Sequence, residues 1–272
     1  MYRRKPAVAG SFYPSNPQRL GEMIDGYMKE AKGAPSAGEI VGVLSPHAGY
    51  VYSGPVAAFS FSQLDPDITL AVVLAPSHRA RFDGAAVLPG GVFETPLGDV
   101  TIDEAVGSAL AEKKPFGLLK QAHELEHSLE VQVPFLQKRL REFSIVPVIV
   151  GTVELETCLA IARGLHEGLD GDTRRLAVVI STDLSHYHPY DEATVMDGRF
   201  IKALESFDEK SVKAVLDSGT AEACGEGPVL AGMALCRLLG ADRVRVLKYA
   251  NSGDTAGSRD QVVGYLSAAF VK

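Results

Sequence analysis

The sequence predicts a single α/β domain over residues 1–272, built as a three-layer α/β/α sandwich. Apolar runs of strand length alternate along the chain with stretches of helical spacing, and these runs are continuous in Val, Ile and Leu. Continuous runs are typical of strands that helices cover on both faces. No long linker rich in Pro, Gly or Ser divides the chain, so we expect one domain rather than two.

Six strands and six helices are predicted. The strands are expected at residues 40–44, 70–74, 145–150, 176–180, 244–249 and 262–270. The helices are expected at residues 17–31, 103–113, 126–141, 157–169, 192–206 and 229–239. Pro134 is expected to kink or break the third helix, because proline lacks the N–H that a helix interior needs.

Composition narrows the class of protein. The 272 residues are 46% hydrophobic, and 34 acidic against 27 basic residues give a formal net charge of -7. That balance argues against a nucleic-acid-binding protein and favours a small-molecule or peptide ligand. Prolines and glycines interrupt both the basic start and the uncharged stretch 40–64, so neither a secretion signal nor a membrane helix is expected. Three cysteines without a CxxC pair indicate no disulfide framework, and we expect a soluble, cytoplasmic protein.

Histidines follow the predicted strands at three places. His47 and His78 each come just after an apolar strand, and Asp183 and His186 follow a third. Ligands of open α/β sheets bind beyond the carboxyl ends of the strands, so these side chains are expected to share one cleft. His47 and His78 are candidate metal ligands, with hydrogen-bonding or capping roles as the alternative. The prolines before them stiffen both turns.

Cys224 is the candidate third ligand. It precedes Gly225, Gly227 and Pro228, where a helix is expected to begin, and the positive end of that helix would lower the pKa of the thiol. Two imidazoles and one thiolate would leave a coordination position open. Glu226 is the alternative third ligand. Cys158 and Cys236 are expected to be buried apolar residues.

His186 and Asp183 are candidate catalytic groups. Asp183 stands three residues before His186, where its carboxylate could orient the imidazole for general acid/base work. An N-cap role for Asp183 is equally consistent with the sequence. His188 is expected to face solvent.

The segment His123-Glu124-Leu125-Glu126-His127 matches the HExxH motif of zinc metalloproteases. Glu126 is charged where such motifs carry an apolar residue, and Pro134 follows soon after. We therefore expect His123 to lie outside the site, and His127 and Glu130 to face the cleft from one side of a helix.

Seven motifs along the chain are similar to those of the Memo family, known in prokaryotes as AmmeMemoRadiSam system protein B. They are RRKPAVAGSFYP, SPHAGYVYSGPVAA, LAPSHRARFDGAA, HELEHSLEVQVPFLQ, ISTDLSHYHPY, CGEGPVLAGM and YANSGDTAGSRDQVVGYLSAAF. The resemblance implies a mixed-sheet fold like that of the LigB-type class III extradiol dioxygenases. It places His47, His78 and Cys224 at metal-ligand positions and His186 at the acid/base position. Asp183 and His127 fall within the same cleft motifs and are the further candidate catalytic residues.

The resemblance implies a metal-dependent redox enzyme that activates oxygen or a small molecule, with iron(II) as the expected metal and copper or zinc as alternatives. Cys224 stands where the dioxygenases have a carboxylate, which argues against ring cleavage. The expected partners are a small-molecule or peptide substrate, together with Amme-type and radical SAM proteins. A non-catalytic adaptor that binds phosphotyrosine peptides in the same cleft is the second hypothesis. A zinc metalloprotease is the third.

Overall fold

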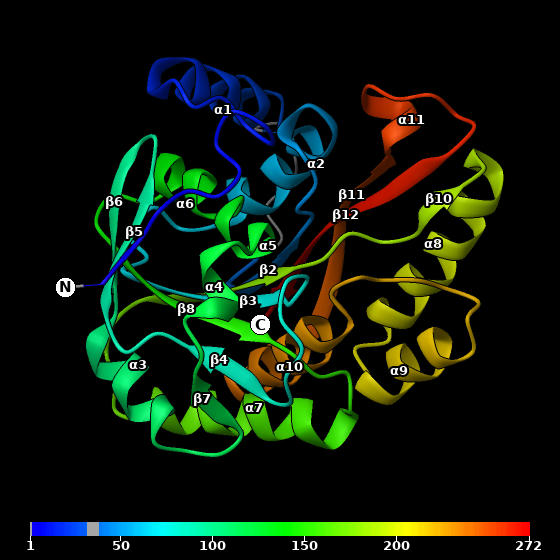
Figure 1. Cartoon of the computed structure of the whole chain (residues 1–272). Coiled ribbons are helices and arrows are strands. Elements are labelled where there is room, and N and C mark those ends of the chain that lie inside the picture. Colours follow the sequence, from blue (N-terminus) through cyan, green and yellow to red (C-terminus); the bar gives the residue numbers. More distant parts are fainter. Residues whose placement is uncertain (1, 32–37) are drawn as a thin grey trace.

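The computed structural model of the chain describes residues 2–31 and 38–272. In this part of the chain the strands build a mixed sheet, and helices cover both of its faces (Figure 1). The predicted three-layer α/β/α architecture is therefore confirmed. None of the helices in the described ranges combines the length and the apolar character needed to cross a membrane.

The strands and helices alternate through most of the chain. The strands are β1 (Arg3–Arg4), β2 (Ile40–Ser45), β3 (Leu70–Pro76), β4 (Ala85–Val87), β5 (Gly91–Thr95), β6 (Gly98–Ile102), β7 (Phe116–Leu118), β8 (Ser144–Val150), β9 (Leu176–Ser181), β10 (His186–His188), β11 (Arg243–Asn251) and β12 (Val262–Val271). The helices are α1 (Pro17–Ala31), α2 (Tyr50–Gln63), α3 (Glu104–Ala111), α4 (Gln121–Glu124), α5 (His127–Glu130), α6 (Val133–Arg139), α7 (Leu155–Gly168), α8 (Tyr190–Glu205), α9 (Glu209–Asp217), α10 (Glu226–Leu238) and α11 (Ser252–Thr255).

The sheet topology brings three strand ends together. The order is β1-β5-β6-β8-β3-β9-β2-β12-β10, with β11 beside β12 and β4 beside β7 and β8. The central strands β8, β3, β9 and β2 run parallel, whereas β12 is antiparallel to β2. Parallel neighbours end at the same edge of a sheet, so the segments after β2, β3 and β9 emerge side by side. These segments carry His47, His78 and Asp183.

Side chains of the central strands enter two separate cores. On β3, Leu70 and Leu74 face a core shared with α3, α7, α8, α9 and α10. Ala71 and Ala75 face the opposite core, shared with α1, α2, α5 and α6. Because both faces are covered, the strand needs no polar residue, and this explains its continuous apolar run.

The predicted elements agree with the structure at most positions. All six predicted strands are present to within two residues at each end, and five of the six helices to within three. The helix predicted at 126–141 is wrong, because the chain forms two helices, α5 and α6, interrupted at Val131 and Gln132. Pro134 begins α6 instead of breaking a longer helix, in the first turn, where the missing N–H is not needed.

Helix α2 was not predicted, because Pro55 lies inside it and Gly54 precedes that proline. The glycine is required by packing: a Cβ at Gly54 would stand 2.5 Å from the ring of Tyr27 on α1. Helix α2 therefore contains weak helix formers and is stabilised by close packing against α1. Local helix preferences do not reflect such packing, so they do not predict this helix.

Candidate metal centre

His47 follows β2 and Pro46, and its side chain is only 2% exposed. Its Nδ1 lies 2.9 Å from Ser181 Oγ. The Ser181 hydroxyl donates its hydrogen to Ser128 O at 2.7 Å, so it can only accept from the imidazole. Nδ1 of His47 therefore carries the hydrogen, and Nε2 presents a lone pair. That lone pair faces Cys224 Sγ, 3.1 Å away.

His78 follows β3, and its orientation is set by Glu126. The Glu126 carboxylate accepts from the backbone N–H of His78 at 2.5 Å and from Nδ1 at 2.9 Å. Burial raises the pKa of this carboxyl group, but the hydrogen bonds from His78 and from the backbone of Ser128 prevail and lower it to about 2. Because Nδ1 of His78 is held as a donor, its Nε2 is left available for a metal.

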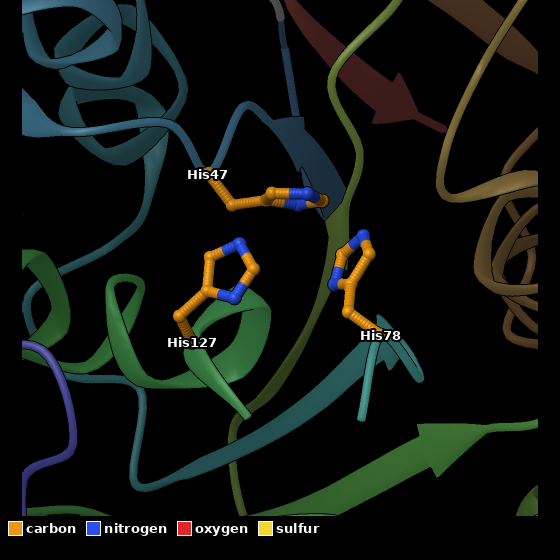
Figure 2. Close-up of side chains that lie close together, drawn as sticks. All are labelled: His47, His78 and His127. Carbon is orange, nitrogen blue, oxygen red and sulfur yellow. The ribbon is translucent and has the colours of Figure 1, made fainter. Parts of the chain in front are cut away.

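His127 begins α5 and completes a group of three imidazoles, shown in Figure 2. Its ring stacks on that of His78 with centroids 4.8 Å apart and lies 5.6 Å from that of His47. One nitrogen from each of the three rings lies within 4.8 Å of the others. Nδ1 of His127 is buried and makes no hydrogen bond to any residue that the structure describes, although Glu126 Oε1 is 3.3 Å away. An unpartnered nitrogen of this kind is a suitable metal ligand.

Cys224 lies beside His47 as the sequence predicts, but its ionisation differs from the expectation. Burial and the nearby Asp183 raise the pKa of the thiol well above its ordinary value, whereas the sequence predicted a lowered one. Helix α10 begins at Glu226 with Gly225 as N-cap, so the sulfur lies outside the first turn, and desolvation outweighs the helix dipole. Gly225 permits the close approach to β9, because a Cβ there would stand 2.4 Å from Ser181 O.

Asp183 supports His47 rather than His186. Its Oδ1 accepts from the backbone N–H of His47 at 2.7 Å, and its Oδ2 lies 4.0 Å from His47 Nε2. Residues 182–185 belong to no helix, so the N-cap alternative is also wrong. Burial raises the pKa of the Asp183 carboxyl to about 7, even though the backbone N–H groups of His47 and Ala48 lower it.

His186 begins β10 at the edge of the cleft. Its backbone N–H donates to Glu222 Oε2 at 3.1 Å, and a hollow of about 350 Å³ is lined by His186 and Cys224 among others. Burial lowers the pKa of the His186 imidazole, so the ring is neutral at pH 7. His188 is not simply solvent-facing, because its Nε2 pairs with Glu222 Oε1 at 2.9 Å.

Glu226, the alternative third ligand, and His123, of the HExxH motif, lie apart from the group of three imidazoles. Glu226 pairs with Lys213 Nζ at 2.9 Å and does not belong to the group of three imidazoles, although it lines the same hollow as His186 and Cys224. His123 is buried, and its Nε2 donates to Ala86 O at 3.2 Å. The HExxH segment spans two helices, α4 and α5, with Glu126 as the N-cap of the second. His123 and His127 therefore do not form the pair of zinc ligands of a metalloprotease, and this agrees with the expectation that His123 lies outside the site.

Glu130 does not face the cleft, contrary to the expectation, because it is buried against Arg4.

Sequence reasoning missed the residues that hold the imidazoles. Glu126 appeared only as a flaw in the HExxH motif, yet it binds His78 and lies against His127. Gln132 donates from Nε2 to Ser181 Oγ at 2.8 Å and so completes the support of His47. The nearest signal was the charge of Glu126 at a position where HExxH motifs carry an apolar residue, since a carboxylate buried at such a position must be paired or hydrogen-bonded.

Comparisons with known proteins show the family of this chain. The Memo-like protein family matches residues 4–269. A MEMO1 family protein from Methanothermobacter thermautotrophicus is 39% identical over 272 residues, covering 96% of this chain and 98% of that protein. MEMO1 family proteins from Methanocaldococcus jannaschii (38% identity, 97% of this chain and 98% of that protein) and Methanopyrus kandleri (36%, 98% of each) are similar along their whole lengths.

The solved structure of an uncharacterized protein from Escherichia coli K12 covers 77% of this chain and 88% of its own, with 15% identity and a TM-score of 0.49. The identity and the TM-score are too low for this structure to add to the family assignment. The match over residues 4–269 and the identity of 36–39% to relatives of the same length are sufficient. This chain is a member of the Memo family.

Proposed function

We propose that this protein is a metal-dependent redox enzyme whose single metal ion, iron(II), is held by His47, His78 and Cys224. The observation that carries the proposal is the convergence of donor atoms: three imidazole nitrogens lie within 4.8 Å of one another, and Cys224 Sγ lies 3.1 Å from one of these rings. Imidazole and thiolate donors suit iron, copper and zinc, so copper and zinc are the alternatives.

The two supporting networks favour His47 and His78 as the fixed ligands. Each has its Nδ1 held by a buried hydrogen-bond partner, which fixes the tautomer and leaves Nε2 free. Cys224 and His127 compete for the third position. Because Nε2 of His47 carries no hydrogen, the Cys224 thiol donates to it, and ligation would replace that hydrogen.

When bound, iron(II) would supply one-electron chemistry and a place for oxygen or a small substrate. The protein itself supplies His186, a neutral imidazole next to the hollow that also reaches Cys224. It can take a proton from a substrate group in that hollow and return it later. Asp183 holds the backbone of the His47 turn and so contributes to the geometry of the centre.

The wider setting belongs to the same proposal. The substrate is a small molecule or a peptide side chain that fits beside His186, and Amme-type and radical SAM proteins are the proposed partners in modifying it. A cytoplasmic location is consistent with three cysteines that form no disulfide.

Elemental analysis of protein purified without oxygen tests the proposal. The wild type should contain close to one iron per chain, Cys224→Ser should lose most of it, and the matched control Cys158→Ser should retain it. Retention by Cys224→Ser together with loss in His127→Ala would assign the third position to His127. Absence of metal from the wild type, combined with binding of a phosphotyrosine peptide, would contradict the enzyme and favour the adaptor.

A further inference from the structure

A buried ion pair lies next to the proposed metal centre. The Arg4 and Glu130 side chains are both 0% exposed, and Arg4 Nη1 donates to Glu130 Oε2. The same carboxylate accepts from the backbone N–H groups of Ala7 at 2.7 Å and Val8 at 3.0 Å, and from the Tyr13 hydroxyl at 2.5 Å. One carboxylate on α5 thus fastens the N-terminal segment 4–13 to the helix that begins with His127.

The remaining donors of Arg4 reach the interrupted HExxH segment. Arg4 Nε donates to His123 O at 2.9 Å, and Nη2 donates to Glu126 O at 2.5 Å. These two carbonyls lie on either side of Leu125, where α4 ends and before α5 begins. His123 O belongs to the last residues of α4, whereas Glu126 O is the N-cap carbonyl of α5. Arg4 therefore binds the backbone on both sides of the interruption with one rigid guanidinium group.

The interruption is what brings the site residues into place. Because α4 ends at Glu124, Glu126 takes an extended conformation as the N-cap of α5, and its side chain turns to His78. His127 then begins the new helix with its ring against that of His78. The N-terminal segment also contributes Phe12, whose ring meets the His127 ring edge-on with centroids 4.9 Å apart.

We propose that Arg4, anchored by Glu130, is a positioning residue that holds segment 123–130 in the interrupted conformation on which the metal centre depends. The inference rests on the proposed function for its metal readout, but it also makes a claim about the metal-free chain. Arg4 touches no proposed ligand directly and acts through the backbone of His123 and Glu126.

Arg4→Lys tests this role, with Arg3→Lys as the matched control. A lysine can keep the pair with Glu130, but its ammonium group cannot reproduce the guanidinium fork that reaches both carbonyls. Arg3 is the neighbouring arginine on β1, its side chain is 48% exposed, and among the described residues it forms ion pairs only with Glu94 and Asp99. The double variant Arg4→Gln with Glu130→Gln removes both charges, so no buried charge is left unpaired if the single variant fails to fold.

Two measurements are made on each variant. Hydrogen exchange of the metal-free protein reports the protection of segment 123–130 against that of the central strands. Titration with Co²⁺ reports affinity and, from the visible spectrum, the geometry of the bound ion. We expect Arg4→Lys to lose protection selectively in segment 123–130, to bind Co²⁺ about 10–100-fold more weakly, and to show an altered spectrum, while Arg3→Lys matches the wild type.

Wild-type protection and Co²⁺ affinity in Arg4→Lys would overturn the inference, as would a loss of protection spread evenly over the sheet. If the wild type binds no Co²⁺, the proposed metal function fails. The exchange pattern then decides the role of Arg4 alone: selective exposure of segment 123–130 supports it, and unchanged protection refutes it.

Discussion

His123 should make the protein unstable in mild acid, because it is a buried neutral histidine. Burial lowers the pKa of its imidazole from 6.5 to about 3, and Nε2 is committed as a donor to Ala86 O. The unfolded chain binds a proton at this residue below pH 6.5, whereas the folded chain does not until about pH 3. The contribution of the neutral His123 imidazole to the free energy of unfolding is therefore complete above pH 6.5 and is lost as the pH falls. Between pH 7.5 and 5.0 the loss amounts to about 2 kcal/mol.

Urea unfolding at pH 7.5 and 5.0 measures this contribution. His123→Gln keeps a donor for Ala86 O but cannot ionise, so its free energy of unfolding should fall about 2 kcal/mol less than that of the wild type over the same interval. His166→Gln, on α7, is the control for removing a histidine elsewhere. Metal content should be unchanged in His123→Gln. An equal pH dependence of wild type and variant, or loss of metal from the variant, would refute this account of His123.

Three further predictions follow from single contacts. Glu126→Gln should weaken binding of the metal about 10–100-fold in a competition titration, because the charged partner of His78 is lost, and unchanged affinity would remove Glu126 from the site. Gly225→Ala should lower the free energy of unfolding by about 1–3 kcal/mol, measured by thermal unfolding, because the added Cβ would clash with a backbone carbonyl of β9. Unchanged stability of this variant would contradict the close approach of α10 to β9. Burial raises the pKa of the Asp103 carboxyl, but hydrogen bonds, chiefly from Arg174, outweigh this effect and lower the pKa. The Asp103 carboxylate therefore stabilises the fold above about pH 4, and this contribution is lost as the pH falls. Asp103→Ala should lower the free energy of unfolding by about 1–2 kcal/mol at pH 7, and in acid unfolding curves the difference from wild type should shrink as the pH falls below about 4.

The strands that position the site could be predicted because their apolar runs are continuous and end in turns that carry polar residues. His47 and His78 follow β2 and β3, two of three strands that lie together at the centre of the sheet, so knowing the strand ends nearly suffices to bring them together. The contact of Cys224 with His47 depends instead on how α10 approaches β9, which no local pattern in the sequence encodes.

The supporting groups could not be predicted, because their roles arise from an interruption in regular structure. Helical spacing over 126–141 favours one helix, but α5 ends at Glu130 and α6 begins only at Val133. A second break lies just before this range, between the end of α4 at Glu124 and the start of α5 at His127. The partners that stabilise this break come from Arg4, more than a hundred residues away. Likewise, the lowered thiol pKa predicted for Cys224 considered the helix dipole alone, whereas burial next to Asp183 dominates.

We propose, as the central claim, that one metal ion is bound by the imidazoles of His47 and His78 and by the sulfur of Cys224, which lies 3.1 Å from His47 Nε2. X-ray absorption at the edge of the bound metal tests it most directly, because a thiolate ligand gives a scatterer at about 2.3 Å and imidazoles give scatterers at about 2.0–2.1 Å. We predict one sulfur and at least two nitrogen scatterers in the wild type, with the sulfur absent in Cys224→Ser. A spectrum of the wild type with nitrogen and oxygen scatterers only would contradict this ligand set.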